Sequence, residues 1–113
     1  MSDIKRIIEA LIEFRDERDW AQFHDSKNLA LGLSIEASEL NELFLWKNSI
    51  DDIESIGREK LSDELADVLT FAFLLAEKNN LNVEKIVLDK IKKNDEKYPV
   101  EKSKGTSKKY TEL

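Results

Sequence analysis

The sequence predicts an all-α protein, built as a four-helix bundle that assembles into an oligomer. Only three glycines and one proline occur among 113 residues, which leaves little material for turns. The strongly periodic segments all place their apolar residues at the helical spacing. Because a chain of 113 residues with 41% hydrophobic residues buries a modest core as a single copy, we expect it to assemble with other copies.

The composition excludes several classes of function. The chain has no cysteine, which removes disulfides, thiolate metal sites and thiol catalysis. We find no signal-like apolar stretch and no span long enough to cross a membrane, so we expect a cytoplasmic protein. The formal net charge of −6 argues against binding to a nucleic acid polymer, since such proteins need a basic surface. It does not argue against one small phosphate ligand that enters with a divalent metal.

The first predicted helix begins after a cap at Ser2 or Asp3. From Phe14 to Ser26 the pattern is irregular, so this helix should end there and an aromatic loop should lead to the next one. We expect the second helix to run from about Asn28 to about Lys47, with Ser26 as its cap. The apolar stripe of the first helix has bundle spacing and consists of Ile4, Ile7, Ile8, Leu11 and Ile12.

Residues 48–57 form a predicted polar connection, in which Asp51 or Ser55 caps the third helix. That helix should cover residues 58–78, and a fourth should run from about Asn82 to Lys97, ended by Tyr98 and Pro99. Beyond Pro99 the chain loses apolar residues and becomes locally basic. We therefore predict an all-α domain over residues 1–99 and a basic, flexible tail over 100–113 that is mobile without ligand.

Two acidic pairs occupy the apolar faces of the second and third predicted helices. At about 100° per residue, Glu36 falls within its apolar stripe with Glu39 at the edge, and Glu64 falls within the other stripe with Asp67 at the margin. An ionised carboxylate on a buried face must be protonated, paired or bound to a cation. Two such helices facing each other would gather the oxygen ligands that Mg²⁺ prefers. The alternative is a solvated charged face.

The two acidic segments also align with each other. Residues 33–40 and 61–68 match without a gap, which indicates a pseudo-twofold pair of acidic helices. Chance similarity within a sequence rich in leucine, serine and glutamate is the alternative.

Other side chains suit a phosphate or a base. Lys90 and Asn94 lie one turn apart on one side of the fourth predicted helix and could meet a phosphate; a snorkelling lysine and a capping asparagine explain them equally well. Trp20 and Trp46 could stack on a nucleobase, with ordinary core packing as the alternative. The sole histidine, His24, does not support a histidine-bearing di-iron bundle or a zinc site.

The motif residues resemble a known family. Glu36-Ala-Ser-Glu39-Leu40, followed by Asp63-Glu64-Leu65-Ala66-Asp67-Val68, resembles the paired acidic motif of the all-α nucleoside triphosphate pyrophosphohydrolases, the MazG-like superfamily. The resemblance is closest to the dCTP pyrophosphatase family and covers nearly the whole chain. It is carried by residues 14–20, 23–24, 27–29 and 43–47, by Tyr98-Pro99, and by residues 107–113.

The resemblance implies hydrolysis of a nucleoside triphosphate between its α and β phosphates, which yields a monophosphate and pyrophosphate. It also implies a homotetramer, built as a dimer of dimers, with sites lined by more than one subunit. Mg²⁺ would be held by residues that match the family's ligands, namely Glu36, Glu39, Glu64 and Asp67.

The resemblance also assigns the substrate contacts. Trp20 and Trp46 match residues of the base pocket, where Phe71 stands in place of the tyrosine of vertebrate dCTP enzymes. Lys90, Asn94 and Tyr98 match residues near the phosphates or sugar. We expect the tail to order over the nucleotide, because Lys108 and Lys109 offer charge to a triphosphate.

Phosphate-ester hydrolysis needs the charge on the reacting phosphate neutralised and a water placed in line. We expect Glu36 or Glu39 to orient or deprotonate that water while the other acids hold Mg²⁺. The predicted substrate is dCTP or 5-modified dCTP. The alternatives are an all-α dUTPase, a broad housecleaning pyrophosphatase for damaged nucleotides, and a non-catalytic helical bundle that binds a partner through its apolar faces.

Overall fold

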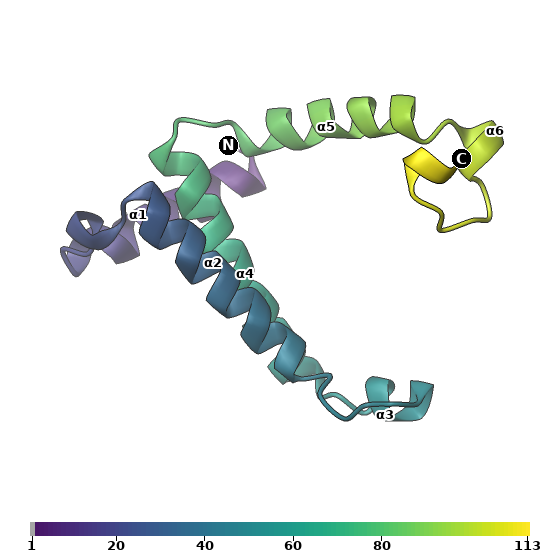
Figure 1. The fold of residues 1–113 in the computed structure, drawn as a ribbon. Coiled ribbons are helices and arrows are strands. Elements are labelled where there is room, and N and C mark those ends of the chain that lie inside the picture. The colour runs from purple at the N-terminus through teal and green to yellow at the C-terminus, as the bar shows by residue number, and fades with distance from the viewer. Residues whose placement is uncertain (1) are drawn as a thin grey trace. The chain divides into compact units, whose positions relative to one another are not determined.

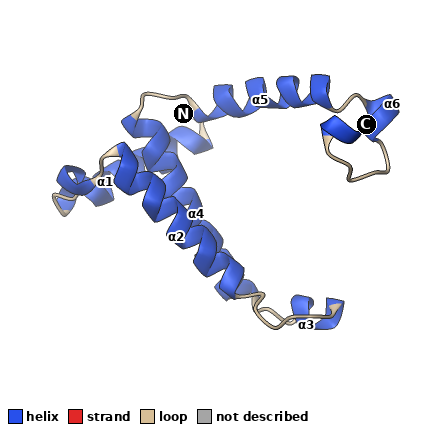
Figure 2. Ribbon diagram, viewed as in Figure 1, coloured by secondary structure: helices blue, strands red, loops and turns tan. Residues whose placement is uncertain are grey.

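Helices account for all the regular secondary structure in residues 2–113, which are the residues that the computed structural model describes (Figure 2). This confirms the predicted all-α class. The chain divides into two units, Met1–Leu81 and Asn82–Leu113, which are described separately below. No helix among the described residues is long and apolar enough to cross a membrane.

The first unit contains three long helices and one short one (Figure 1). They are α1 (Asp3–Glu17), α2 (Ser26–Glu42), α3 (Ile50–Glu54) and α4 (Arg58–Lys78), with a 3₁₀ turn, η1 (Ala21–Phe23), between α1 and α2. The Ser2 side chain caps α1 by accepting a hydrogen bond of 3.2 Å from the backbone N–H of Lys5. The helix ends inside the segment that the sequence marked as irregular.

The predicted limits of the second helix are wrong at both ends. Asp25, not Ser26, is the cap of α2, because its carboxylate accepts a hydrogen bond of 2.7 Å from the backbone N–H of Asn28. The helix stops at Glu42, short of Lys47. The chain then tightens into turns, and Trp46 takes a left-handed backbone conformation with φ of 64°, which ends the helical path.

The predicted polar connection contains an extra helix, α3, that the sequence analysis missed. Ser49 caps it by accepting a hydrogen bond of 3.1 Å from the backbone N–H of Asp52. Asp51 therefore lies in the first turn of α3, where its negative charge interacts favourably with the helix dipole, and it does not cap α4. Gly57 occupies the cap position of α4, without a capping side chain, so Ser55 is not that cap either.

The central feature of the first unit is the pairing of α2 with α4. Asn79 at the end of α4 donates a hydrogen bond of 3.0 Å to the hydroxyl of Ser26 at the start of α2. Glu36, further along α2, lies beside Asp67, further back along α4, so the two helices run antiparallel. The most deeply buried side chain is Leu29 of α2, which is 1% exposed, and the buried residues of α4 are Leu74 and Ala76.

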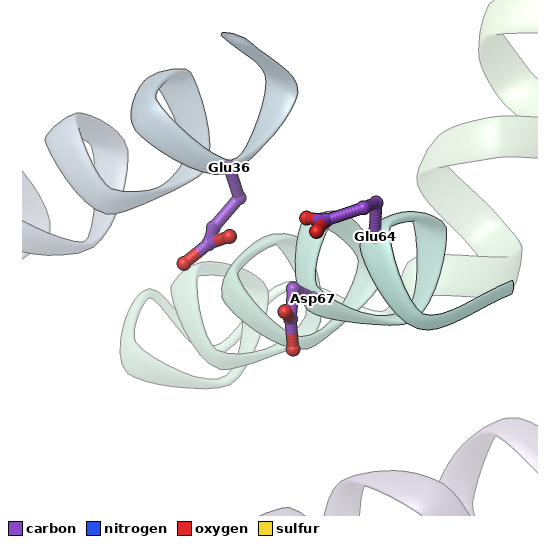
Figure 3. Close-up of side chains that lie close together, drawn as sticks. All are labelled: Glu36, Glu64 and Asp67. Carbon is purple, nitrogen blue, oxygen red and sulfur yellow. The ribbon is translucent and has the colours of Figure 1, made fainter. Parts of the chain in front are cut away.

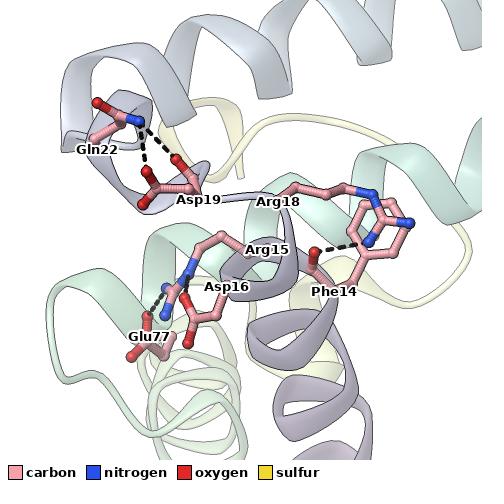
Figure 4. A network of polar contacts seen from close by, with 7 residues as sticks. All are labelled: Phe14, Arg15, Asp16, Arg18, Asp19, Gln22 and Glu77. Atoms are coloured by element: carbon pink, nitrogen blue, oxygen red, sulfur yellow. Dashed lines mark hydrogen bonds and ion pairs between the residues drawn. The ribbon is translucent and has the colours of Figure 1, made fainter.

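Helix α1 packs on α4 and is tied to it by an ion pair (Figure 4). The guanidinium of Arg15 donates to the carboxylate of Glu77 at 3.1 Å and to that of Asp16 at 2.8 Å. Arg15 is 15% exposed and Glu77 is 32% exposed, so water screens this pair less than an ordinary surface pair. The contact fixes the end of α1 against the end of α4.

The second unit contains α5 (Val83–Lys97), α6 (Val100–Ser103) and the 3₁₀ turn η2 (Tyr110–Glu112). Asn82 caps α5 by accepting from the backbone N–H of Lys85 at 2.9 Å, and the helix ends at Lys97 as predicted. The chain then turns back, with Gly105 at φ of 80°. The ring of Tyr110 packs edge-on against the ring of Tyr98, with 5.9 Å between the ring centroids.

The tail beyond Pro99 therefore contains two helical elements, α6 and η2, that the sequence analysis did not predict. The contacts place the boundary between units at Leu81, and the division into a domain over residues 1–99 and a tail over 100–113 stays a prediction. The apolar side chains of α5 include Ile86, Val87 and Ile91, and all three are exposed.

Candidate functional site

Three of the four predicted metal ligands meet between α2 and α4 (Figure 3). Glu36 extends from α2 toward α4, and Glu64 and Asp67 project from successive turns of α4. One carboxylate oxygen of each residue lies within 4.8 Å of the other two. The antiparallel pairing brings the acids together although they lie far apart in the sequence.

Two of these residues also carry a buried carboxylate oxygen without a hydrogen-bond partner among residues 2–113, namely Oε2 of Glu36 and Oε2 of Glu64. Both side chains are half-buried, while Asp67 is exposed. A buried acceptor without a donor loses its hydrogen bonds to water and forms no hydrogen bond within the protein, which costs free energy. A cation between the carboxylates would satisfy both oxygens, and three carboxylates suit a hard divalent ion. The donor set therefore fits a metal site.

The acids also perturb one another. The pKa of Glu36 is raised to about 7, first by burial, then by hydrogen bonding to Glu39 and by the negative charges of Glu39, Asp67 and Glu64. Burial likewise raises the pKa of Glu64, followed by the charges of Glu39 and Asp67. Both carboxyl groups are thus harder to ionise than in the unfolded chain. A cation at this position would reverse that penalty.

Glu39 lies beside this group of three oxygens and not within it. It is exposed at the edge of the α2 face, yet it is close enough to Glu36 to affect the pKa of that residue. The structure therefore gathers Glu36, Glu64 and Asp67 and leaves Glu39 as a neighbour. Its role as a metal ligand stays a prediction.

Phe71 lies one turn beyond Asp67 on α4 and contacts Gly32 of α2. A side chain added at Gly32 would place its Cβ only 2.4 Å from Cε1 of Phe71. Gly32 was not among the predicted site residues. The signal that could have found it is a lone glycine inside a helical pattern.

The two tryptophans are not core residues of the single chain. Trp20 is 43% exposed, and its ring packs edge-on against the ring of Phe14, with 5.8 Å between the ring centroids. Trp46 is 82% exposed, and it follows the end of α2 that carries the acids. Core packing within one chain does not account for Trp46, so its predicted contact with a base stays open.

The predicted phosphate and sugar residues all belong to the second unit. Lys90 and Asn94 line one open pocket on α5 with three apolar neighbours, Ile86, Val87 and Ile91. Tyr98 is half-buried and contacts Tyr110. Lys108 and Lys109 are exposed immediately before η2. Their roles stay predictions.

A cavity of about 300 Å³ lies near the other end of the α2 and α4 pair. It contains none of the clustered acids, and its charged lining includes Arg15, which is already engaged by two carboxylates. Burial, followed by the charge of Arg15, lowers the pKa of His24 on its wall. The carboxylate of Glu77 on the cavity wall is paired with Arg15, so we assign the chemistry to the acid cluster.

Comparisons with known proteins agree with this geometry. The MazG-like family profile matches residues 31–113. The dCTP pyrophosphatase 1 of Rattus norvegicus is 38% identical over 117 residues, an alignment that covers 100% of this chain and 67% of that protein. The dCTP pyrophosphatase 1 of Homo sapiens shows the same identity and the same coverage.

A solved structure is similar as well. The crystal structure of a pyrophosphatase from Archaeoglobus fulgidus superposes with a TM-score of 0.83 at 35% sequence identity, covering 88% of this chain and 94% of that one. The similarity thus includes the family profile, sequence alignments over the whole of this chain, and the arrangement of the helices. The chain belongs to the MazG-like family.

Proposed function

We propose that this chain is a Mg²⁺-dependent nucleoside triphosphate pyrophosphohydrolase that converts dCTP or 5-modified dCTP to the monophosphate and pyrophosphate. The observation that carries the proposal is the cluster of Glu36, Glu64 and Asp67, in which one carboxylate oxygen of each residue lies within 4.8 Å of the others. Glu36 and Glu64 also each carry a buried oxygen without a donor. The choice of substrate is supported by the relatives named dCTP pyrophosphatase 1.

Glu36, Glu64 and Asp67 would hold the metal. When bound, Mg²⁺ neutralises charge on the phosphates and helps to align the reacting groups. The half-buried position of Glu36 and Glu64 strengthens their electrostatic interactions, since less water screens them. The divalent ion is supported by the all-carboxylate donor set, and the choice of Mg²⁺ follows from the preference of that ion for oxygen ligands.

The reaction needs a proton acceptor for the attacking water. The water oxygen bonds to the α phosphorus, the bond from that phosphorus to the bridging oxygen of the β phosphate breaks, and pyrophosphate leaves. The proton of the water passes to a carboxylate, either Glu36 or Glu39. We favour Glu39, because it lies beside the three clustered oxygens and is exposed, so it is free to contact a water.

The base and phosphate contacts follow the family. Trp20, Trp46 and Phe71 would surround the base, and the exposure of both tryptophan rings leaves them available for stacking. On the second unit, Lys90, Asn94 and Tyr98 would contact phosphates or sugar. The tail lysines, Lys108 and Lys109, would add charge opposite the triphosphate.

We also propose that the protein acts as a homotetramer, a dimer of dimers. Support comes from the many large apolar side chains that the single chain leaves exposed, among them Leu31 and Ile35 of α2 and Leu65 and Leu69 of α4. Exposed apolar side chains in this number are typical of a chain that buries them against a partner. A cytoplasmic location stays the expectation drawn from the sequence.

The test is pyrophosphate release from the four common dNTPs and dUTP, with and without Mg²⁺. We expect dCTP to be the preferred substrate and activity to require the metal. Glu36→Gln and Asp67→Asn should each lower kcat by more than about 100-fold, since even residues that only support metal ligands have effects approaching that size. Glu9→Gln, the same change at an exposed position of α1, is the matched control.

Light scattering should show that each variant keeps the assembly state of the unaltered protein. Activity within a few-fold of the unaltered protein in either acid variant would contradict the metal assignment. A preference for dUTP, or for damaged nucleotides over dCTP, would contradict the substrate assignment and leave the metal site intact.

A further inference from the structure

Gly32 lies in the interior of α2, where glycine is unfavourable because it loses more conformational freedom on folding than any other residue. The structure supplies a reason for its presence. An added Cβ would lie 2.4 Å from Cε1, 2.7 Å from Cδ1 and 3.0 Å from Cζ of Phe71. The phenyl ring of α4 therefore lies directly on the backbone of α2, in space that any larger residue would fill.

This contact is the packing layer next to the acid cluster. Gly32 lies one helical turn before Glu36, and Phe71 lies one turn after Asp67 on the antiparallel partner helix. On the side away from the acids, the next layer contains the buried residues Leu29 and Leu74. The ring thus lies between the layer of Leu29 and Leu74 and the layer of the carboxylates.

We propose that Gly32 is a positioning residue for the metal site. By admitting the Phe71 ring against the α2 backbone, it sets the separation of α2 and α4 at which Glu36 reaches Glu64 and Asp67. The inference rests on the proposed function, because it concerns the same cluster. It adds a residue that touches neither metal nor substrate.

The size of the expected displacement follows from the contact distance. Ordinary contact of a Cβ atom begins at 3.4 Å, so a methyl group at 2.4 Å requires a shift of about 1 Å. Mg²⁺ demands near-ideal ligand geometry, with ligands at about 2.0–2.1 Å. If the helices move apart, Glu36 can no longer share one ion with the two acids of α4. The cost then appears in metal affinity.

The experiment measures Mg²⁺ binding to the full chain by calorimetry, in the absence of nucleotide. We expect Gly32→Ala to raise the Mg²⁺ dissociation constant at least about tenfold, the scale on which residues that orient metal ligands act. Adding Phe71→Val to that variant removes all three ring atoms that the new Cβ would meet, and the double variant should bind within roughly threefold of the unaltered chain. Gly57→Ala is the matched control, because nothing lies within 4 Å of a Cβ at that position.

Thermal unfolding without metal gives an independent readout with a distinctive sign. Replacing a helix-interior glycine with alanine ordinarily raises the melting temperature. We expect Gly32→Ala to lower it and the double variant to recover it. If Gly32→Ala does not fold, the double variant provides the test. A double variant that folds and binds Mg²⁺ with restored affinity supports the proposal, and one that does not fold or does not bind Mg²⁺ overturns it.

The remaining outcomes separate this inference from the proposed function. If the unaltered chain binds Mg²⁺ and Gly32→Ala binds it as tightly, the inference alone is wrong. Weak binding that persists in the double variant also overturns it, because the steric cause is then absent. If the unaltered chain binds no Mg²⁺, the metal assignment and the inference both fall.

Discussion

Replacing Glu36 with glutamine should stabilise the metal-free protein at pH 8 and have little effect at pH 4. The folded protein holds the pKa of this carboxyl at about 7, above its ordinary value of 4.5. The native state therefore binds the proton more tightly than the unfolded chain does. The contribution of the Glu36 carboxyl group to the free energy of unfolding is fully present below the ordinary pKa and is lost as the pH rises through the raised pKa.

The magnitude follows from the size of the rise. A shift from 4.5 to about 7, with an allowance for solvent screening of a half-buried side chain, corresponds to roughly 2 to 3 kcal/mol. Glutamine has nearly the same shape and does not ionise, so the variant avoids this penalty. Its advantage should grow between about pH 4.5 and pH 7 and then level off.

The assay is chemical unfolding at equal protein concentrations across this pH range, with a chelator present. Glu9→Gln on the exposed face of α1 controls for the loss of one negative charge. Added Mg²⁺ should stabilise the unaltered protein by roughly 2.7 kcal/mol at a hundredfold excess over its dissociation constant. It should stabilise Glu36→Gln much less, because one ligand is lost.

Two results would refute this reasoning. A stability difference between Glu36→Gln and the unaltered protein that does not change with pH would mean that the carboxyl is not perturbed by folding. A free energy of unfolding indifferent to Mg²⁺ in both proteins would mean that the acids are solvated and hold no ion.

Further predictions concern the substrate contacts and the helix packing. Trp20→Ala or Trp46→Ala should weaken binding of a nonhydrolysable dCTP analogue by roughly 1 to 3 kcal/mol and change pyrophosphate binding less; lower melting temperatures with unchanged affinity would instead assign the rings to packing. Tyr110→Ala should raise KM by freeing the tail, while Tyr110→Phe should keep the 5.9 Å ring contact with Tyr98 and leave KM unchanged; equal KM values for both variants would exclude the tail from the site. A double-mutant cycle on Arg15 and Glu77, paired at 3.1 Å, should give a coupling of roughly 1 kcal/mol, and a value near zero would show that the pair is screened.

The local features of this fold were the easiest to predict. The limits of α4 and the end of α5 follow from strong apolar periodicity and from Asn79 and Pro99, so their prediction is confirmed. The predicted end of α2 was wrong, because the helical path stops before Trp46, which has a left-handed backbone conformation. Helix α3 was missed, because it depends on a cap at Ser49 within a polar stretch. Short helices of this kind carry too few apolar positions to show a period.

The sequence alone determined the helical class, the placement of the acids on apolar faces and the family. These features follow from residue type and spacing, which the sequence gives directly. Only the tertiary structure decided that Glu36, Glu64 and Asp67 share one group of oxygens while Glu39 stands beside it. Only the structure revealed that Gly32 admits the Phe71 ring. Both facts depend on the register and separation of α2 and α4, and these arise from side-chain packing between helices that no periodicity within one helix can report.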